Sequence, residues 1–255
     1  MWKVIRSSEV GTSHIEANQT CQDSCFAGVF QGEDAQDYLV CIVSDGAGSA
    51  IKGGEGAELA CEMIAKSVEI ALSQVELIPI SELLVQEWIR HTQKNISQTA
   101  SSLGLTARDY ACTLLGAVIG LKQAIFFQIG DGAIVVSNSG CSQGVVFWPD
   151  AGIYANMTYF VTDEEALQHL HVSVITASID EVAIFSDGLQ RLALSFENRI
   201  PHIPFFEPMF TRLRESSIEE CEALDSQLSK FLQSTQINER TDDDKTLILA
   251  TRRML

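Results

Sequence analysis

Short apolar runs recur along the chain and predict β-strands. Several of them are separated by only two to five residues, a spacing that favours antiparallel pairing. The expected strands are Trp2–Arg6, Ser24–Phe30, Tyr38–Ser44, Ala111–Gly120, Ala124–Ile129, Ala133–Ser137, Gly144–Trp148, Thr158–Thr162, Val172–Thr176, Val182–Ser186 and Thr246–Ala250.

Four segments instead have apolar residues at helical spacing: Glu55–Ser73, Ser81–Ser101, Phe205–Arg214 and Ile218–Gln233. Ser81 and Ser217 are the expected N-caps of the second and fourth helices. Because strands and helices do not alternate regularly, the chain is expected to be α+β. Many strands are apolar on both faces, which predicts a central antiparallel β-sandwich flanked by pairs of helices in α-β-β-α layers. No linker or repeat divides the chain, so residues 1–255 are expected to form one domain.

The composition of the chain indicates which partners and which cellular compartment to expect. The 255 residues carry 34 acidic and 17 basic side chains, a net charge of −17, which argues against binding to nucleic acid or to a membrane surface. The N-terminal residues are too polar for a signal peptide, and the longest apolar tract, 111–129, is interrupted by Lys122 and Gln123. The seven cysteines include no CxxC pair and are expected to be reduced thiols. A cytoplasmic location is therefore expected.

Aspartates stand where buried strands are expected to end. Asp45, Asp131 and Asp187 each follow an apolar run and precede glycine, and the group 242–244 precedes the last strand. One Asp-Gly pair alone is an ordinary turn signal. Four acidic groups at strand ends are instead expected to converge at one edge, where protons or cations must relieve their repulsion. Oxygen-only donors suit magnesium or manganese.

Other catalytic patterns are missing from the sequence. It contains no Gly-Lys dipeptide for a Walker-type phosphate loop, no HExxH and no GxSxG. No cysteine has arginine six residues later, as cysteine phosphatases require, and the five histidines do not show the spacing of metal ligands.

Taken in order, these residues resemble the metal-dependent serine/threonine protein phosphatases of type 2C, and particularly their bacterial branch. The resemblance runs along nearly the whole chain. Its segments are Gly11–Asp23, Ser44–Gly48, Gly54–Ala57, Ala111–Thr113 with Ile129–Gly132, Ser186–Leu189 and Asp243–Thr246.

This resemblance implies a site with two divalent ions, Mn²⁺ or Mg²⁺, that share a hydroxide. The hydroxide would attack the phosphorus of phosphoserine or phosphothreonine in a protein substrate directly. Asp45, Asp187 and Asp243 would be the catalytic ligands. The metal-binding set would be Asp23, Asp45, the Gly46 carbonyl, Asp131, Asp187 and Asp243, with Asp23 acting directly or through water and Asp131 helping to hold a third, more labile ion. A mobile flap is implied at 149–170.

The chain departs from the family pattern at three positions. Ala47 replaces the histidine that animal members place after Asp-Gly as a proposed general acid. The arginine that grips substrate phosphate in the first motif is absent, and His14 is the nearest candidate for phosphate contact, against a local turn role. Asp244 replaces the usual asparagine and adds a carboxylate beside Asp243, which is expected to alter metal affinity.

Two alternatives stay open at this point. The missing arginine is also consistent with a catalytically weak regulatory module that keeps the fold and binds phosphoproteins. A phosphatase with an aspartyl nucleophile is disfavoured because no acidic residue stands two positions from Asp187.

Overall fold

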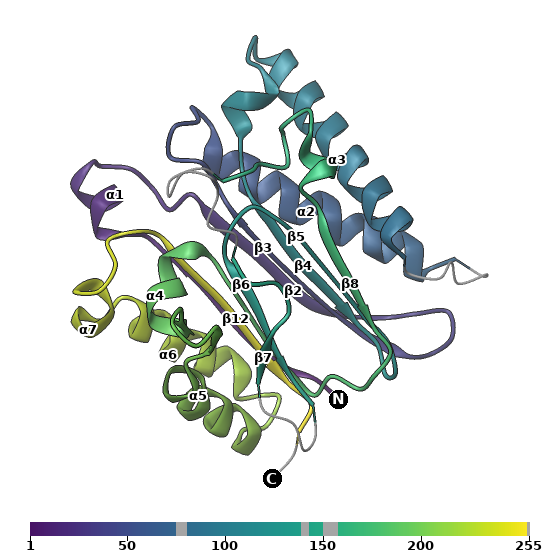
Figure 1. Ribbon diagram of the computed structural model, residues 1–255, viewed down its shortest axis with the longest axis vertical. Coiled ribbons are helices and arrows are strands. Elements are labelled where there is room, and N and C mark those ends of the chain that lie inside the picture. Colours follow the sequence, from purple (N-terminus) through teal and green to yellow (C-terminus); the bar gives the residue numbers. More distant parts are fainter. Residues whose placement is uncertain (75–80, 139–142, 150–157, 254–255) are drawn as a thin grey trace.

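Two five-stranded antiparallel sheets form the centre of the protein (Figure 1). The computed structural model describes residues 1–74, 81–138, 143–149 and 158–253. The first sheet has the order β1 (Lys3–Glu9), β12 (Lys245–Thr251), β9 (Glu181–Phe185), β6 (Ala133–Ser137) and β7 (Gly144–Val145). The second has the order β2 (Asp23–Gln31), β3 (Asp37–Asp45), β4 (Leu114–Ile119), β5 (Ala124–Ile129) and β8 (His171–Ile175).

The central strands are apolar on both faces because each face has its own core. In β3, Leu39, Cys41 and Val43 point into the core between the two sheets, whereas Val40 and Ile42 point into the core beneath a pair of helices. All five side chains are fully buried. This alternation follows from the two-residue period of a strand, and it explains why β3 is an unbroken apolar run.

Each outer face of the sandwich is covered by a pair of helices (Figure 1). Helices α2 (Gly53–Leu72) and α3 (Glu82–Ser102) cover the second sheet, and α5 (Ile203–Glu215) and α6 (Cys221–Leu232) cover the first. The expected α+β sandwich with α-β-β-α layers is therefore confirmed. Shorter elements are α1 (Thr12–Glu16), α4 (Gln190–Ala193), α7 (Thr235–Asn238), β10 (Leu194–Ser195), β11 (Ile200–Pro201) and 3-10 turns at Ala107–Tyr110, Ala166–Gln168 and Asp187–Leu189.

Two local predictions were wrong. The segment 158–162 is not a strand: the Val161 amide donates to the Cys112 carbonyl, and the Gln93 side chain of α3 donates to the Val161 carbonyl. Its backbone is thus satisfied without a strand partner. Ser217 does not cap α6, which begins after Glu220, whereas Ser81 does accept the Leu84 amide as predicted.

None of the helices in the described ranges is both long and apolar enough to cross a membrane. Six cysteines lie in the described part of the chain, and none of these six forms a disulfide; Cys141 lies outside the described residues. The cytoplasmic location stays a prediction.

Candidate functional site

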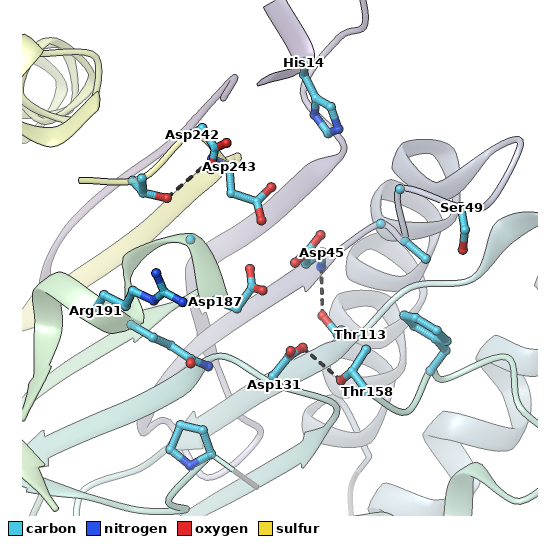
Figure 2. Close-up of a pocket in the computed structure, with 18 of the residues that line it drawn as sticks. His14, Asp45, Ser49, Thr113, Asp131, Thr158, Asp187, Arg191, Asp242 and Asp243 are labelled. Atoms are coloured by element: carbon cyan, nitrogen blue, oxygen red, sulfur yellow. Dashed lines mark hydrogen bonds between the residues drawn. The ribbon is translucent and has the colours of Figure 1, made fainter. Parts of the chain in front are cut away.

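A cavity of about 870 Å³ opens at one end of the sandwich, where the predicted aspartates meet (Figure 2). Asp45 ends β3, Asp131 lies between β5 and β6, Asp187 follows β9, and Asp243 precedes β12. All four line this cavity, together with the predicted residues His14 and Gly46. The structure thus brings together residues that are far apart in the sequence.

Asp45 is fixed by the segment that leads into β4. Its backbone amide donates to Thr113 Oγ1 at 3.0 Å, and the Thr113 amide donates back to the Asp45 carbonyl at 2.8 Å. The Ser44 hydroxyl adds a 2.6 Å bond to the Thr113 carbonyl. These reciprocal bonds hold the end of β3, so the Asp45 carboxylate enters the cavity from a rigid position.

Asp23 lies behind the cavity. It is not among the lining residues and is only 8% exposed. The Ser186 hydroxyl donates to Asp23 Oδ2 at 2.7 Å and accepts the Thr246 amide at 3.0 Å. Asp23 also faces Asp45 across the β2–β3 pair. It therefore joins both sheets directly beneath the cavity.

Asp131 sits between two glycines that have left-handed backbone angles. Gly130 has φ +93° and Gly132 has φ +101°, values that side-chain-bearing residues rarely adopt. The Thr158 hydroxyl donates to Asp131 Oδ1 at 2.9 Å (Figure 2). The tight turn between β5 and β6 thereby directs Asp131 into the cavity.

Gly188, which follows Asp187, has no left-handed backbone angle, but it leaves no room for a side chain. A Cβ atom at this position would lie 2.0 Å from the Asp244 carbonyl oxygen, which belongs to the backbone. We therefore expect Gly188→Ala to lower the free energy of unfolding by about 2 kcal/mol or more. Gly144→Ala is the matched control, because no atom of the described residues lies within 4 Å of its Cβ position. Urea unfolding of both variants measures the difference; equal stabilities would contradict the close approach.

Asp244 does not add a carboxylate to the cavity, contrary to the simplest expectation from its position beside Asp243. It is 3% exposed and accepts the amides of Gly11 at 2.6 Å and Gln22 at 2.5 Å. His14 Nδ1 lies 2.9 Å from Asp244 Oδ2. Two of the departures from the family pattern therefore contact each other, and Asp244 anchors the segment that carries His14.

Burial and mutual repulsion disfavour ionisation of the clustered carboxylates. Burial, followed by the charges of Asp23 and Asp187, raises the pKa of Asp45 well above its usual value. Burial, with the Asp131 and Asp243 charges, raises the pKa of Asp187 to about 7, and burial raises the pKa of Asp23 to about 6. Burial also raises the pKa of Asp243. A bound cation would reverse each of these effects.

The donor atoms fit a hard divalent cation. Asp23 Oδ1 and Asp187 Oδ1 are buried and accept no hydrogen bond from the described residues. Across the same residues, no group of three or more acidic, imidazole or thiol side chains is placed so that it could hold a metal ion by itself. Magnesium and manganese sites need only a few carboxylates, because a backbone carbonyl and water complete the shell. Asp45, Asp187, Asp243 and the Gly46 carbonyl offer such an incomplete oxygen set.

Comparison with known proteins agrees with the family resemblance of the sequence motifs. A family model described as protein phosphatase 2C matches residues 10–233. The chain belongs to the protein phosphatase 2C family. Membership of this family makes it a phosphoprotein phosphatase. It is 40% identical over 249 residues to serine/threonine-protein phosphatase 3 of Escherichia coli (strain K12), an alignment that covers 98% of each chain.

Solved structures of bacterial phosphatases share the fold of this family member. A bacterial serine phosphatase superposes with a TM-score of 0.63 at 17% identity, over 100% of this chain and 99% of the other. The catalytic domain of the serine/threonine protein phosphatase PstP, in complex with two manganese ions, gives 0.63 at 14% identity over 98% and 97%. RsbX in complex with magnesium gives 0.57 at 16% identity over 98% and 94%. Divalent cations thus occur in proteins with this fold.

Sequence reasoning missed two arginines at this phosphatase site. Arg191 and Arg240 both line the cavity. Arg191 follows Asp187 by four residues, about one helical turn, which is the one signal that could have revealed it. Arg240 precedes Asp243 by three residues in an irregular segment, where the sequence offers no comparable signal.

Proposed function

We propose that this phosphatase hydrolyses phosphoserine and phosphothreonine in proteins by direct, metal-dependent attack of water on phosphorus. The observation that supports this most strongly is the cluster of carboxylates in and beneath the cavity, whose raised pKa values and unpartnered oxygens call for cations. Two bound Mn²⁺ or Mg²⁺ ions would supply an activated water and neutralise charge in the transition state. No phosphorylated enzyme intermediate is then needed.

The cavity aspartates have distinct proposed roles. Asp45 would serve both ions, because its carboxylate interacts with those of Asp23, Asp187 and Asp243 and its backbone is held by Thr113. Asp187 and Asp243 would complete the coordination shell of one ion, and the Gly46 carbonyl would be a ligand of the other. Asp23 would act through water, since it is buried behind the cavity rather than lining it. Asp131 would help to hold a third, labile ion.

His14 is proposed to contact the substrate through Nε2. Its Nδ1 faces Asp244 at 2.9 Å, so the ring is oriented by a buried carboxylate while its edge lines the cavity (Figure 2). Ala47 also lines the cavity but offers no proton donor, so water is left to protonate the leaving oxygen of serine or threonine.

The segment 149–170 is proposed as a flap of the single domain. Residues 150–157 lie outside the described residues, but the residues on either side of them border the cavity through Pro149, Thr158 and Phe160. Gln93 of α3 holds the middle of the segment by donating to the carbonyls of Val161 and Asp163. Phosphorylated proteins are the proposed partners, and the net charge of −17 disfavours nucleic acid and membrane surfaces.

A metal-dependence assay tests the proposal. The purified protein is treated with EDTA and assayed with phosphoserine, phosphothreonine and phosphotyrosine peptides before and after addition of Mn²⁺ or Mg²⁺. We expect EDTA to abolish hydrolysis of the serine and threonine peptides and Mn²⁺ to restore it.

Two results would contradict the proposal. Peptide binding without turnover at any metal concentration would favour the regulatory module. A trapped phosphoaspartate would favour an aspartyl nucleophile.

A further inference from the structure

The cavity is lined by more acidic than basic side chains, yet it contains the guanidinium groups of Arg191 and Arg240. Several arginines elsewhere pair with carboxylates: Arg212 with Glu220, Arg214 with Glu181 and Glu207, and Arg252 with Asp180. Others donate to neutral groups, Arg6 to the Ala27 carbonyl and Arg90 to the Gln86 side chain. Within the described ranges, Arg191 and Arg240 form no such pair, although the chain has twice as many acidic as basic residues. These two groups are therefore available to an anion.

The local fold directs Arg191 towards the reacting region. The 3-10 turn Asp187–Leu189 continues directly into α4, so Asp187 and Arg191 lie about one turn apart on the same side. In Figure 2 the guanidinium extends from this turn towards the Asp187 carboxylate and the cavity. The base of the side chain is well anchored, because Leu189 and Leu192 on either side of it are buried in the core under α5 and α6.

We propose that Arg191 binds the non-bridging oxygens of the substrate phosphate, which rests on the proposed function. A guanidinium presents paired N–H donors that match two phosphate oxygens, and it stays charged at any working pH. Cations at Asp45 and Asp187 would draw the phosphate to the cavity, and Arg191 would bind the oxygens that face away from them. The chain thereby supplies a phosphate-binding arginine from α4 in place of one in the first motif.

Neither Arg240 nor His14 fits this role as well. Arg240 also lines a second, mostly apolar cavity of about 530 Å³ between α5, α6 and α7, so its side chain is shared between two surfaces. His14 has one ring nitrogen facing Asp244 and can offer only the other. Of the three, Arg191 combines an unpaired bidentate donor with a regular turn that leads directly from a proposed metal ligand.

The test compares Arg191→Met, Arg191→Lys and Arg240→Met with Arg90→Met. Arg90 lies on the exposed face of α3, where its side chain contacts Gln86, so its replacement removes the same charge away from the cavity. The readouts are KM and kcat for p-nitrophenyl phosphate, the inhibition constant of inorganic phosphate, manganese affinity by calorimetry, and Tm. We expect Arg191→Met to raise KM and the phosphate inhibition constant about tenfold or more, because a charge-assisted hydrogen bond contributes roughly 1.5–3 kcal/mol. Arg191→Lys should recover part of this loss, and Arg90→Met should match the wild type.

Three other results would contradict the proposed role of Arg191 or the function on which it rests. A tenfold effect in Arg240→Met with none in Arg191→Met would assign the phosphate to Arg240. A changed manganese affinity with an unchanged phosphate inhibition constant would show that Arg191 only positions Asp187. If the wild type itself shows no metal-dependent turnover, the proposed function fails first, and this outcome is distinct from an active wild type with an unaffected Arg191→Met variant.

Discussion

Asp45→Asn is expected to abolish turnover and, in the metal-free protein, to increase stability. The Asp45 carboxylate is half-buried; desolvation and the charges of Asp23, Asp187 and Asp243 raise its pKa. Without cations its ionisation opposes folding, so a neutral amide of the same shape relieves repulsion. We expect turnover to fall about 10³-fold or more, because the central ligand is lost. The Tm of the EDTA-treated variant should rise by about 3 °C or more.

Asp37→Asn is the matched control for this prediction. Asp37 begins the same strand, β3, at the end opposite to Asp45, and it is exposed. The two substitutions change the net charge equally, so only a local effect separates them. Calorimetry without metal and a phosphopeptide assay with Mn²⁺ provide the readouts. Undiminished activity in Asp45→Asn would refute the proposed metal site, and a lower Tm would refute the repulsion argument.

The convergence of the aspartates could be anticipated because it depends on a simple property of strands. An apolar run shows where a buried strand ends, and the next polar residue must leave the core there. Asp45 and Asp187 follow such runs, and their strands lie in different sheets that meet at the same end of the sandwich. The sheet register that aligns Asp23 with Asp45 depends on the whole β2–β3 hairpin.

The chemical role of each neighbour could not be inferred in the same way. Asp244 adjoins Asp243 in the sequence, but it turns away from the cavity to accept the amides of Gly11 and Gln22. This contact joins the two ends of the chain, and no local pattern encodes it. Arg191 likewise stands out only in the structure, where it lines the cavity and has no acidic partner among the described residues.

The Asp-Gly pairs also show how one dipeptide can serve different physical needs. Only Gly132 has the positive φ that a turn glycine suggests. Gly46 and Gly188 are required because other backbone segments approach them: a Cβ at Gly46 would lie 2.3 Å from the Gly53 carbonyl carbon. The helix start after Gly53 thus packs against the loop that carries the Gly46 carbonyl. Sequence reasoning placed all three Asp-Gly pairs at strand ends but could not separate these two causes.

The metal-free protein is expected to lose stability between about pH 4 and pH 7, and Mn²⁺ is expected to reverse this trend. Burial raises the pKa of Asp23 to about 6 and of Asp187 to about 7 in the folded protein, whereas both are near 4 when unfolded. In this window the folded state holds more protons than the unfolded state, so the free energy of unfolding decreases as pH rises. Metal binding requires the ionised carboxylates, so manganese affinity and the stability it adds should increase over the same window.

The difference between wild type and Asp187→Asn isolates this contribution from the rest of the chain. Urea unfolding is measured from pH 4.5 to 8 in EDTA and again with excess Mn²⁺. In EDTA, the advantage of Asp187→Asn over wild type should grow with pH and level off above about pH 7, where Asp187 is ionised. With Mn²⁺ the order should reverse, because only the wild type keeps the full ligand set. Parallel pH profiles in EDTA would mean that Asp187 titrates normally, and the cluster would then carry no electrostatic cost for metal binding to relieve.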